Sequence, residues 1–270
     1  MNAKLMFGGA ALSALIVCNA QATTLLSDTF DGYADQAAFV AVWPVVGALP
    51  SGTLSSAQSV SPPNSIFNVG TAVAAEAMRN QRSFAESGTP DSLLNLITFS
   101  FDFHDGNALA SPYRSHSNLQ DSTLPGSYGQ LVAMGLNNNQ TSAANGGNYY
   151  MGRILGYTPP DTGGTSGSFF KLNDVGAPLR SDGWHKLAVV ISSLDFKFYV
   201  DGILSETVLQ TGTLRSYDHV RLGSGLSNAG NASYFDNVLI ETNPIPEPST
   251  VALAVLGGAA LCFVLIRRRK

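Results

Sequence analysis

The sequence predicts an all-β protein, an antiparallel β-sandwich of the jelly-roll kind. About 12 short segments alternate apolar and polar residues, as strands with one buried face do, and polar, glycine-rich turns separate them. Only residues 33–43 and 73–78 carry a helical pattern. About 225 residues lie between two apolar ends, which suffices for one sandwich with a sizeable core.

The clearest strand covers residues 96–104, where Phe99, Phe101 and Phe103 fall on one face and polar residues on the other. The other expected strands are residues 129–138, 148–156, 167–173, 184–192, 196–201, 203–209, 219–223 and 233–241. The two longest expected loops are residues 107–126 and 158–167, and no linker divides the domain.

Residues 1–22 have the features of a secretory signal peptide. Lys4 supplies a basic start, residues 5–18 form an apolar run, and Ala20-Gln21-Ala22 presents the small residues that signal peptidase reads. Cleavage is expected between Ala22 and Thr23. The alternative is a retained N-terminal anchor.

The C-terminal end, residues 244–270, joins three features. Pro246, Glu247 and Pro248 keep the chain extended and non-helical. The apolar residues 251–266 would rise roughly 24 Å as a helix, and with Thr250 they predict a transmembrane helix over residues 250–266. Four basic residues then act as a stop-transfer signal on the cytoplasmic side, so the domain lies outside: Arg267, Arg268, Arg269 and Lys270.

This tail resembles the PEP-CTERM sorting signal of Gram-negative bacteria. The resemblance implies an exosortase-type processing enzyme that recognises Pro246-Glu247-Pro248 and removes the tail, and it implies an association with exopolysaccharide. The expected location is the inner membrane, with the domain outside the cytoplasm, and after processing the cell surface or the medium. The alternative is a plain membrane anchor with a proline-rich stalk.

Charge and cysteine content exclude other classes. The chain has 15 Lys and Arg against 19 Asp and Glu, and five of the basic residues lie in the terminal segments. Nucleic acid is therefore not an expected partner, because phosphate binding needs clustered Lys and Arg. The only two cysteines, Cys18 and Cys262, also lie in the terminal segments, so the mature domain has no disulfides.

One hairpin carries a resemblance at the level of the fold. Residues 182–190 (DGWHKLAVV) and 198–202 (FYVDG) resemble the hairpin of laminin G-like and concanavalin A-like domains, and residues 234–240 resemble their closing strand. The resemblance implies one such domain over residues 23–243. It also implies that Trp184 packs under the hairpin and that Asp201-Gly202 makes the turn.

Catalysis by the glycosidase mechanism of this fold is not expected. Those enzymes carry an E-x-D-x-E strand that places paired carboxylates in a cleft, whereas none of the five glutamates here lies in such a pattern. The expected function is a non-enzymatic surface or matrix protein that binds polysaccharide. The alternatives are a glycan hydrolase or lyase with an unfamiliar site, and a purely structural envelope protein.

Two sets of residues are candidates for binding. Aromatic, amide and guanidinium groups suit a carbohydrate surface, and the candidates are Tyr113, Arg114, His116, Asn138, Tyr150 and Arg153. A structural calcium ion, the one cofactor considered, could bind Asp28, Asp31 and Asp236 if the first and last strands pair. The alternatives are ordinary strand and turn residues in the first set, and a turn and a solvated strand residue in the second.

Overall fold

The computed structural model describes residues 22–47, 49–69, 78–91, 95–106, 115–122, 131–137, 148–155, 169–210, 213–224 and 232–243. All of them lie in one compact unit, residues 22–245. Residues 1–21 of the expected signal peptide, which covers residues 1–22, and the tail from residue 244 onward fall outside the described residues. Within the described part, no helix is long and apolar enough to cross a membrane.

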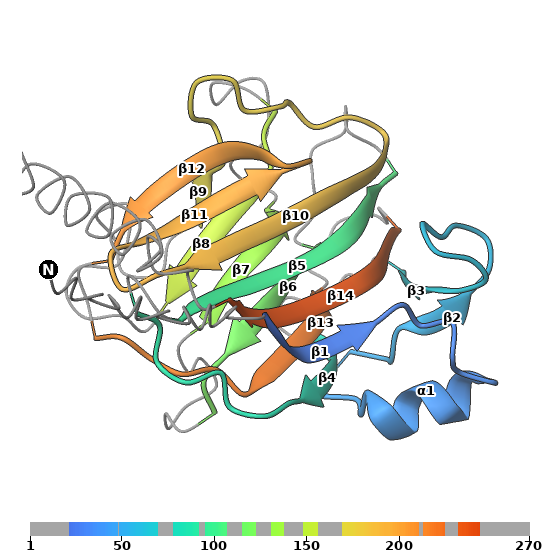
Figure 1. Cartoon of the computed structure of the whole chain (residues 1–270). Coiled ribbons are helices and arrows are strands. Elements are labelled where there is room, and N and C mark those ends of the chain that lie inside the picture. The colour runs from blue at the N-terminus through green and yellow to red at the C-terminus, as the bar shows by residue number, and fades with distance from the viewer. Residues whose placement is uncertain are drawn as a thin grey trace, which may run out of the picture. The chain divides into compact units, whose positions relative to one another are not determined.

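The described strands form two antiparallel sheets, and the prediction of a jelly-roll sandwich is confirmed (Figure 1). Sheet A has the order β12 (Ile203–Leu209), β11 (Asp195–Val200), β10 (Gly183–Ile191), β5 (Leu96–Asp105), β14 (Ser233–Asn243), β3 (Ser65–Asn68) and β2 (Thr53–Ser55), and β1 (Thr23–Asp28) also pairs with β14. Sheet B has the order β4 (Met78–Ser83), β13 (His219–Ser224), β6 (Ser115–Gln120), β7 (Leu131–Leu136), β8 (Met151–Leu155) and β9 (Phe169–Lys171).

The core lies between the two sheets and is rich in phenylalanine. Phe99, Phe101 and Phe103 of β5 are fully buried, as their alternation predicts. The rings of Phe101 and Phe103 contact Phe235 of β14, with ring centres 5.7 and 5.4 Å apart. From sheet B come the buried side chains of β7, β8 and β13. Burying one such aromatic side chain contributes about 1.5–3 kcal/mol, so this layer dominates the stability of the fold.

The first and last strands pair, as the calcium hypothesis requires. Asp28 of β1 lies opposite Val238 of β14, and Thr23 lies opposite Thr242. The expected signal-peptide cleavage site directly precedes Thr23, so the mature chain would begin with the first residue of β1. The N-terminal strand is therefore paired with β14 on one side and faces solvent on the other.

The one described helix, α1 (Gln36–Val42), lies inside the predicted helical segment 33–43. The Asp35 carboxylate caps it by accepting a hydrogen bond from the Ala38 amide at 2.8 Å. Phe39 and Trp43 attach it to the core. Of the other predicted helical segment, 73–78, only Met78 is described, and it begins β4 instead of ending a helix.

The predicted loop 107–126 is wrong at its centre, because β6 occupies residues 115–120 and is an inner strand of sheet B. Its sequence, SHSNLQ, lacks the pattern from which a strand is usually predicted. On the inward face Leu119 is apolar, but Ser115 and Ser117 are small polar residues that are nevertheless buried. On the outward face all three residues are polar. Neither face shows the apolar run from which a strand is normally recognised.

The hairpin of β11 and β12 turns at Asp201 and Gly202, both with positive φ (52° and 78°), as two-residue hairpins require. Trp184 differs from the expectation drawn from the resemblance. On β10 it is His185 that shares the inward face with Leu187, whereas Trp184 points outward and contacts His104 and Tyr234 at 5.2 and 6.5 Å. Trp184 therefore covers β5 and β14 on the outside and does not pack beneath the hairpin.

Candidate functional site

The outward face of sheet B carries a row of mostly polar side chains. Val220 and Leu222 of β13 are buried in the core, so Arg221 between them points outward. The register then fixes its neighbours across the sheet, since directly paired residues share a face. The row runs Gln81, Arg221, Asn118, Ala133, Arg153, Phe169. We call these six residues the sheet B row.

At one end of the row, a guanidinium group lies over an aromatic ring. Arg153 of β8 pairs with Phe169 of β9, and its guanidinium carbon is 4.8 Å from the ring centre. His116 of β6 approaches the same ring edge-on, with the ring centres 5.7 Å apart. Such a cation–aromatic pair holds the guanidinium plane in place.

At the other end, Arg221 is held by a side-chain amide. Its Nε donates to Gln81 Oε1 at 2.6 Å. Burial lowers the pKa of Arg221 from its ordinary value, but arginine is protonated throughout the physiological range. Beside it, the Asn118 amide oxygen is buried and has no hydrogen-bond donor among the described residues. An unpaired buried acceptor costs about 1–3 kcal/mol.

This face also has a distinct charge. Next to the sheet B row lies a second register row, His116, Gly135, Met151 and Lys171. On the opposite side lies the row Ser83, His219, Gln120, Leu131 and Leu155. Among these described residues are three permanent cations, Arg153, Lys171 and Arg221, and no carboxylate. The chain as a whole has a net charge of −4, so this local excess of positive charge runs against its composition.

The residues predicted to bind carbohydrate do not all lie on the same face in the structure. His116 and Arg153 come together on this face through Phe169, as described above. Tyr113, Arg114 and Asn138 lie outside the described residues. Tyr150 is in the wrong place for the predicted role, because it is fully buried between the sheets and contacts Phe103 at 6.3 Å and His185 at 5.4 Å.

Tyr150 instead adjoins a buried ion pair. Arg180 donates from Nε and Nη2 to the two carboxylate oxygens of Asp105, at 2.8 and 3.0 Å, and both residues are almost inaccessible to solvent. The Tyr150 hydroxyl donates to Asp105 at 3.4 Å. Burial, reinforced by the charge of Asp105, raises the pKa of Tyr150. This cluster fastens the segment before β10 to the end of β5, which is a structural role.

The three aspartates considered for calcium have separate protein partners. Asp28 accepts hydrogen bonds from the Phe30 amide, the Tyr33 hydroxyl and Trp43 Nε1, and it pairs with Arg82. Asp31 accepts from the Asn64 amide at 2.9 Å. The described residues contain no group of three or more His, Cys, Asp or Glu side chains that could hold a metal ion. Strand pairing thus brings these aspartates to one region, but not into one ligand set.

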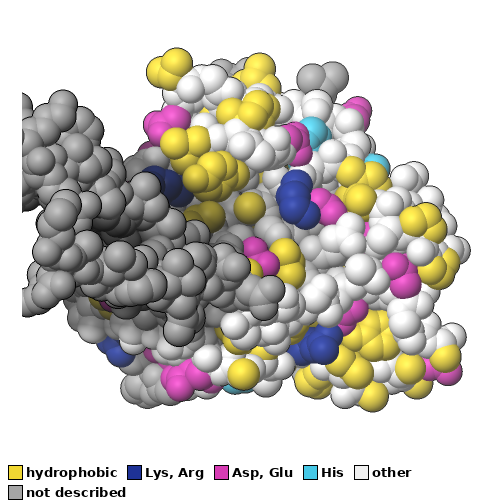
Figure 2. Space-filling view, in the orientation of Figure 1, with side chains coloured by type: hydrophobic (Ala, Val, Ile, Leu, Met, Phe, Trp, Pro, Cys, Tyr) yellow, Lys and Arg dark blue, Asp and Glu magenta, His cyan; other side chains and the backbone are white. Residues whose placement is uncertain are grey.

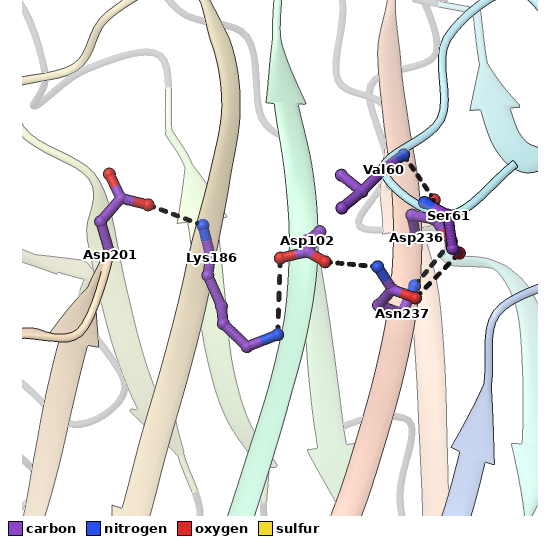
Figure 3. Close-up of polar contacts among 7 residues, drawn as sticks. All are labelled: Val60, Ser61, Asp102, Lys186, Asp201, Asp236 and Asn237. Carbon is purple, nitrogen blue, oxygen red and sulfur yellow. Dashed lines mark hydrogen bonds and ion pairs between the residues drawn. The ribbon is translucent and has the colours of Figure 1, made fainter.

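The third aspartate, Asp236, belongs to a polar chain on the outward face of sheet A (Figure 3). Its carboxylate accepts from the amides of Val60 and Ser61 at 2.8 and 3.1 Å. The neighbouring Asn237, with φ of 48° at a β-bulge, donates to Asp102 at 2.7 Å. Because its oxygens already accept these backbone N–H groups, Asp236 fixes the 60–61 loop to β14.

The outward face of sheet A does not share the charge of the sheet B face. Asp102 lies 3.5 Å from Lys186, whose backbone amide donates to Asp201. On the side of the molecule that shows sheet A, acidic, basic and hydrophobic side chains are interspersed (Figure 2). The described part of this face therefore offers no patch of a single sign.

Comparison with known proteins identifies the tail and the fold. Residues 244–270 match the PEP-CTERM protein-sorting motif. No curated protein matches the chain. Among solved structures, the cellulose induced protein Cip1 is 14% identical with a TM-score of 0.51, covering 80% of this chain and 96% of that one. A carbohydrate esterase of Shiga toxin-encoding bacteriophage phi24B is 16% identical with a TM-score of 0.51, covering 83% and 100%.

A third structure, the β-glucanase of Bacillus licheniformis, is 12% identical with a TM-score of 0.43 and covers 81% of this chain and 98% of that one. At these identities the likeness concerns the fold alone. The protein is thus a concanavalin A-like jelly roll that carries a PEP-CTERM sorting motif. The motif implies an exported protein that is processed by an exosortase.

The residues of the sheet B row were mostly missed in the sequence. Gln81, Asn118, Arg221 and Phe169 come from four strands that are far apart in the chain, and only Arg153 was a candidate. A local signal existed at β13, where His219 and Arg221 alternate with Val220 and Leu222. It predicts an outward-facing pair of cationic or polar residues, but not their neighbours.

Proposed function

We propose that this protein is an exported, exosortase-sorted component of the cell surface or extracellular matrix that binds polysaccharide through the outward face of sheet B and does not cleave glycosidic bonds. The sheet B row carries this proposal. Adjacent strands are spaced about 4.8 Å apart, so six residues in register extend roughly 24 Å across the sheet. Gln81, Arg221, Arg153 and Phe169 are partly exposed, whereas Asn118 and Ala133 between them are buried. A linear polymer lying across the strands would therefore contact the two ends of the row.

The chemistry of the row suits a sugar chain. The Phe169 ring offers an apolar face to sugar C–H groups, while amides and guanidinium groups hydrogen-bond hydroxyls and carboxylates. Arg153 and Arg221 are each fixed by a neighbour, so little side-chain entropy remains to be lost on binding.

Charge favours an anionic polysaccharide over a neutral one. Three cations lie in the three described register rows of this face, and one carboxylate, Asp218, adjoins them beside His219. A chain with uronate or sulfate groups could form charge-assisted hydrogen bonds with Arg153 and Arg221, which are stronger than those to neutral hydroxyls. A chain with a net charge of −4 is not attracted as a whole to a polyanion. Binding of a polyanion would therefore indicate a site on this face and not attraction by the whole surface.

Affinity gel electrophoresis of the purified protein tests the proposal. Gels containing alginate, a polyuronate, should retard the protein, gels containing dextran should not, and added salt should weaken the retardation. Arg153→Ala and Arg221→Ala should each raise the Kd for alginate about tenfold or more, the loss of one charged hydrogen bond. Lys197→Ala is the matched control, because Lys197 lies on sheet A beside Asp195. Equal retardation of all three variants would contradict this binding face.

A further inference from the structure

Ser83, His219 and Asp218 form a hydrogen-bonded chain on the outward side of sheet B. The Ser83 hydroxyl on β4 is 3.0 Å from His219 Nε2 on β13, directly opposite it in register. The other ring nitrogen, Nδ1, is 2.7 Å from the carboxylate of Asp218. A hydroxyl, an imidazole and a carboxylate in this order are the arrangement that activates a serine as a nucleophile.

The partners of the ring fix its protonation pattern. A carboxylate can only accept, so Nδ1 carries the proton and the neutral ring keeps its lone pair on Nε2, which faces the Ser83 hydroxyl. Asp218 is itself fixed, because Ser122 donates to it from both its amide, at 2.9 Å, and its hydroxyl. Burial alone would raise the pKa of Asp218, but hydrogen bonds from His219 and Ser122 lower it overall, so the carboxylate is ionised at neutral pH.

A second trio in the same molecule shows what an inert arrangement looks like. His185 Nδ1 is 2.8 Å from the Asp201 carboxylate, and Nε2 is 3.0 Å from the Ser181 hydroxyl. However, Nε2 is also 2.9 Å from the Ser181 carbonyl oxygen, which can only accept. The Nε2 proton is therefore committed to that carbonyl, and no lone pair remains to take a proton from Ser181.

The two trios also differ in access. Ser83 is exposed on the edge strand β4, and 19% of the His219 side chain is exposed. His185 is buried at 9% and packs against Tyr150. An ester in solution can therefore reach Ser83 but not the inward-facing ring of His185.

We propose that Ser83 and His219 are the catalytic residues of a site that hydrolyses carboxylic esters of alcohols, and that Asp218 is their positioning residue. His219 Nε2 takes the hydroxyl proton while Ser83 Oγ attacks the ester carbonyl carbon. The alkoxide leaves with that proton, and the acyl group stays on Ser83. Water then gives a proton to Nε2 and attacks the acyl carbon; the bond from that carbon to Ser83 Oγ breaks, the acid is released, and Nε2 returns the proton to Ser83 Oγ.

This activity departs from the non-enzymatic expectation, and it does not rest on polysaccharide binding. O-Acyl groups on sugars are one natural form of such esters. They would come close to Ser83 on a polymer bound to the sheet B row, since Ser83 and His219 lie two positions along the strands from Gln81 and Arg221.

The purified full-length protein should hydrolyse p-nitrophenyl acetate, and phenylmethylsulfonyl fluoride should label Ser83, located by peptide mass spectrometry. Ser83→Ala and His219→Gln should lower the rate about 100-fold or more. Asp218→Asn should lower the rate and the labelling of Ser83 with an unchanged thermal melting curve. Ser181→Ala, from the inert trio, is the matched control and should keep the full rate.

Two results would overturn the proposal. One is wild-type protein in which phenylmethylsulfonyl fluoride leaves Ser83 unlabelled, a measurement that depends on no variant. The other is hydrolysis that Ser83→Ala and Ser181→Ala reduce to the same extent. Alginate binding is measured in parallel, because Ser83→Ala should retain it whether or not the esterase activity exists.

Discussion

The guanidinium of Arg153 lies 4.8 Å from the ring centre of Phe169, its direct partner across β8 and β9. This pair places a charged group and an aromatic ring side by side on the outward face of sheet B. The ring holds a cation by its quadrupole and also presents apolar surface beside it. Both residues are in register with Ala133 of β7, which is fully buried.

Replacing Phe169 should therefore weaken polysaccharide binding. Phe169→Ala removes both the stacking surface and the support of Arg153, and interactions of this kind contribute about 0.5–2 kcal/mol. We expect the Kd for alginate to rise about 3- to 30-fold, measured by affinity electrophoresis. Tyr199→Ala is the control, since Tyr199 is a partly exposed aromatic residue on sheet A. The prediction fails if both substitutions change the Kd equally.

The buried ion pair of Arg180 and Asp105 should contribute more to the free energy of unfolding than an exposed ion pair does. Arg180→Met removes the positive charge that faces the buried carboxylate of Asp105, and breaking a buried pair in this way costs about 3–5 kcal/mol. Lys197→Met, at the exposed pair with Asp195, should cost less than about 1 kcal/mol. Urea unfolding of the purified proteins measures both. Similar free energies of unfolding for the two variants would show that Asp105 is solvated.

Asp236 should make stability depend on pH in an unusual direction. Burial raises its pKa above the unfolded value of 3.8, although amides of Ser61, Val60 and Asn237 oppose the change. The folded state therefore holds the proton more tightly, and stability from this group is present below 3.8 and is lost as pH rises through the folded pKa.

The variant Asp236→Asn removes this titration. The free energy of unfolding of wild type minus that of the variant should increase when pH falls from about 7 to about 4.5. Urea unfolding at both pH values gives the difference, in which the contributions of all other groups cancel. A difference that decreases toward low pH would mean that the backbone N–H donors outweigh burial.

How far the sequence predicts the structure depends on the face that a residue occupies. Phe99, Phe101 and Phe103 alternate so regularly that strand, face and burial all follow. β6 was missed because its inward residues Ser115 and Ser117 are polar. Buried hydroxyls can be satisfied by the backbone, as Ser117 shows by donating to the Arg221 carbonyl at 2.8 Å, and composition does not reveal such partners.

The site was harder to predict than the fold for a related reason. Tyr150 and Arg153 were candidates by composition alone, yet one points into the core and the other out of it. The sheet B row depends on the register between strands that are far apart in the chain, such as Arg221 with Asn118. The pairing of β1 with β14, on which the calcium hypothesis depended, is present, but backbone amides donate to the carboxylates of Asp31 and Asp236.

The sorting tail gives the last prediction, because residues 244–270 match the PEP-CTERM motif. We expect the tail to be a transient anchor that an exosortase removes. The apolar run is marginally short for stable anchoring, and Pro246-Glu247-Pro248 marks its outer edge, where a membrane enzyme can reach an extended chain. Mass spectrometry of the protein from its native host should find mature chains that end before residue 251. Glu247→Ala should shift the population toward chains that end at Lys270, with the N-terminus at Thr23 unchanged. If chains ending at Lys270 predominate in both, the tail is an ordinary membrane anchor and not a sorting signal.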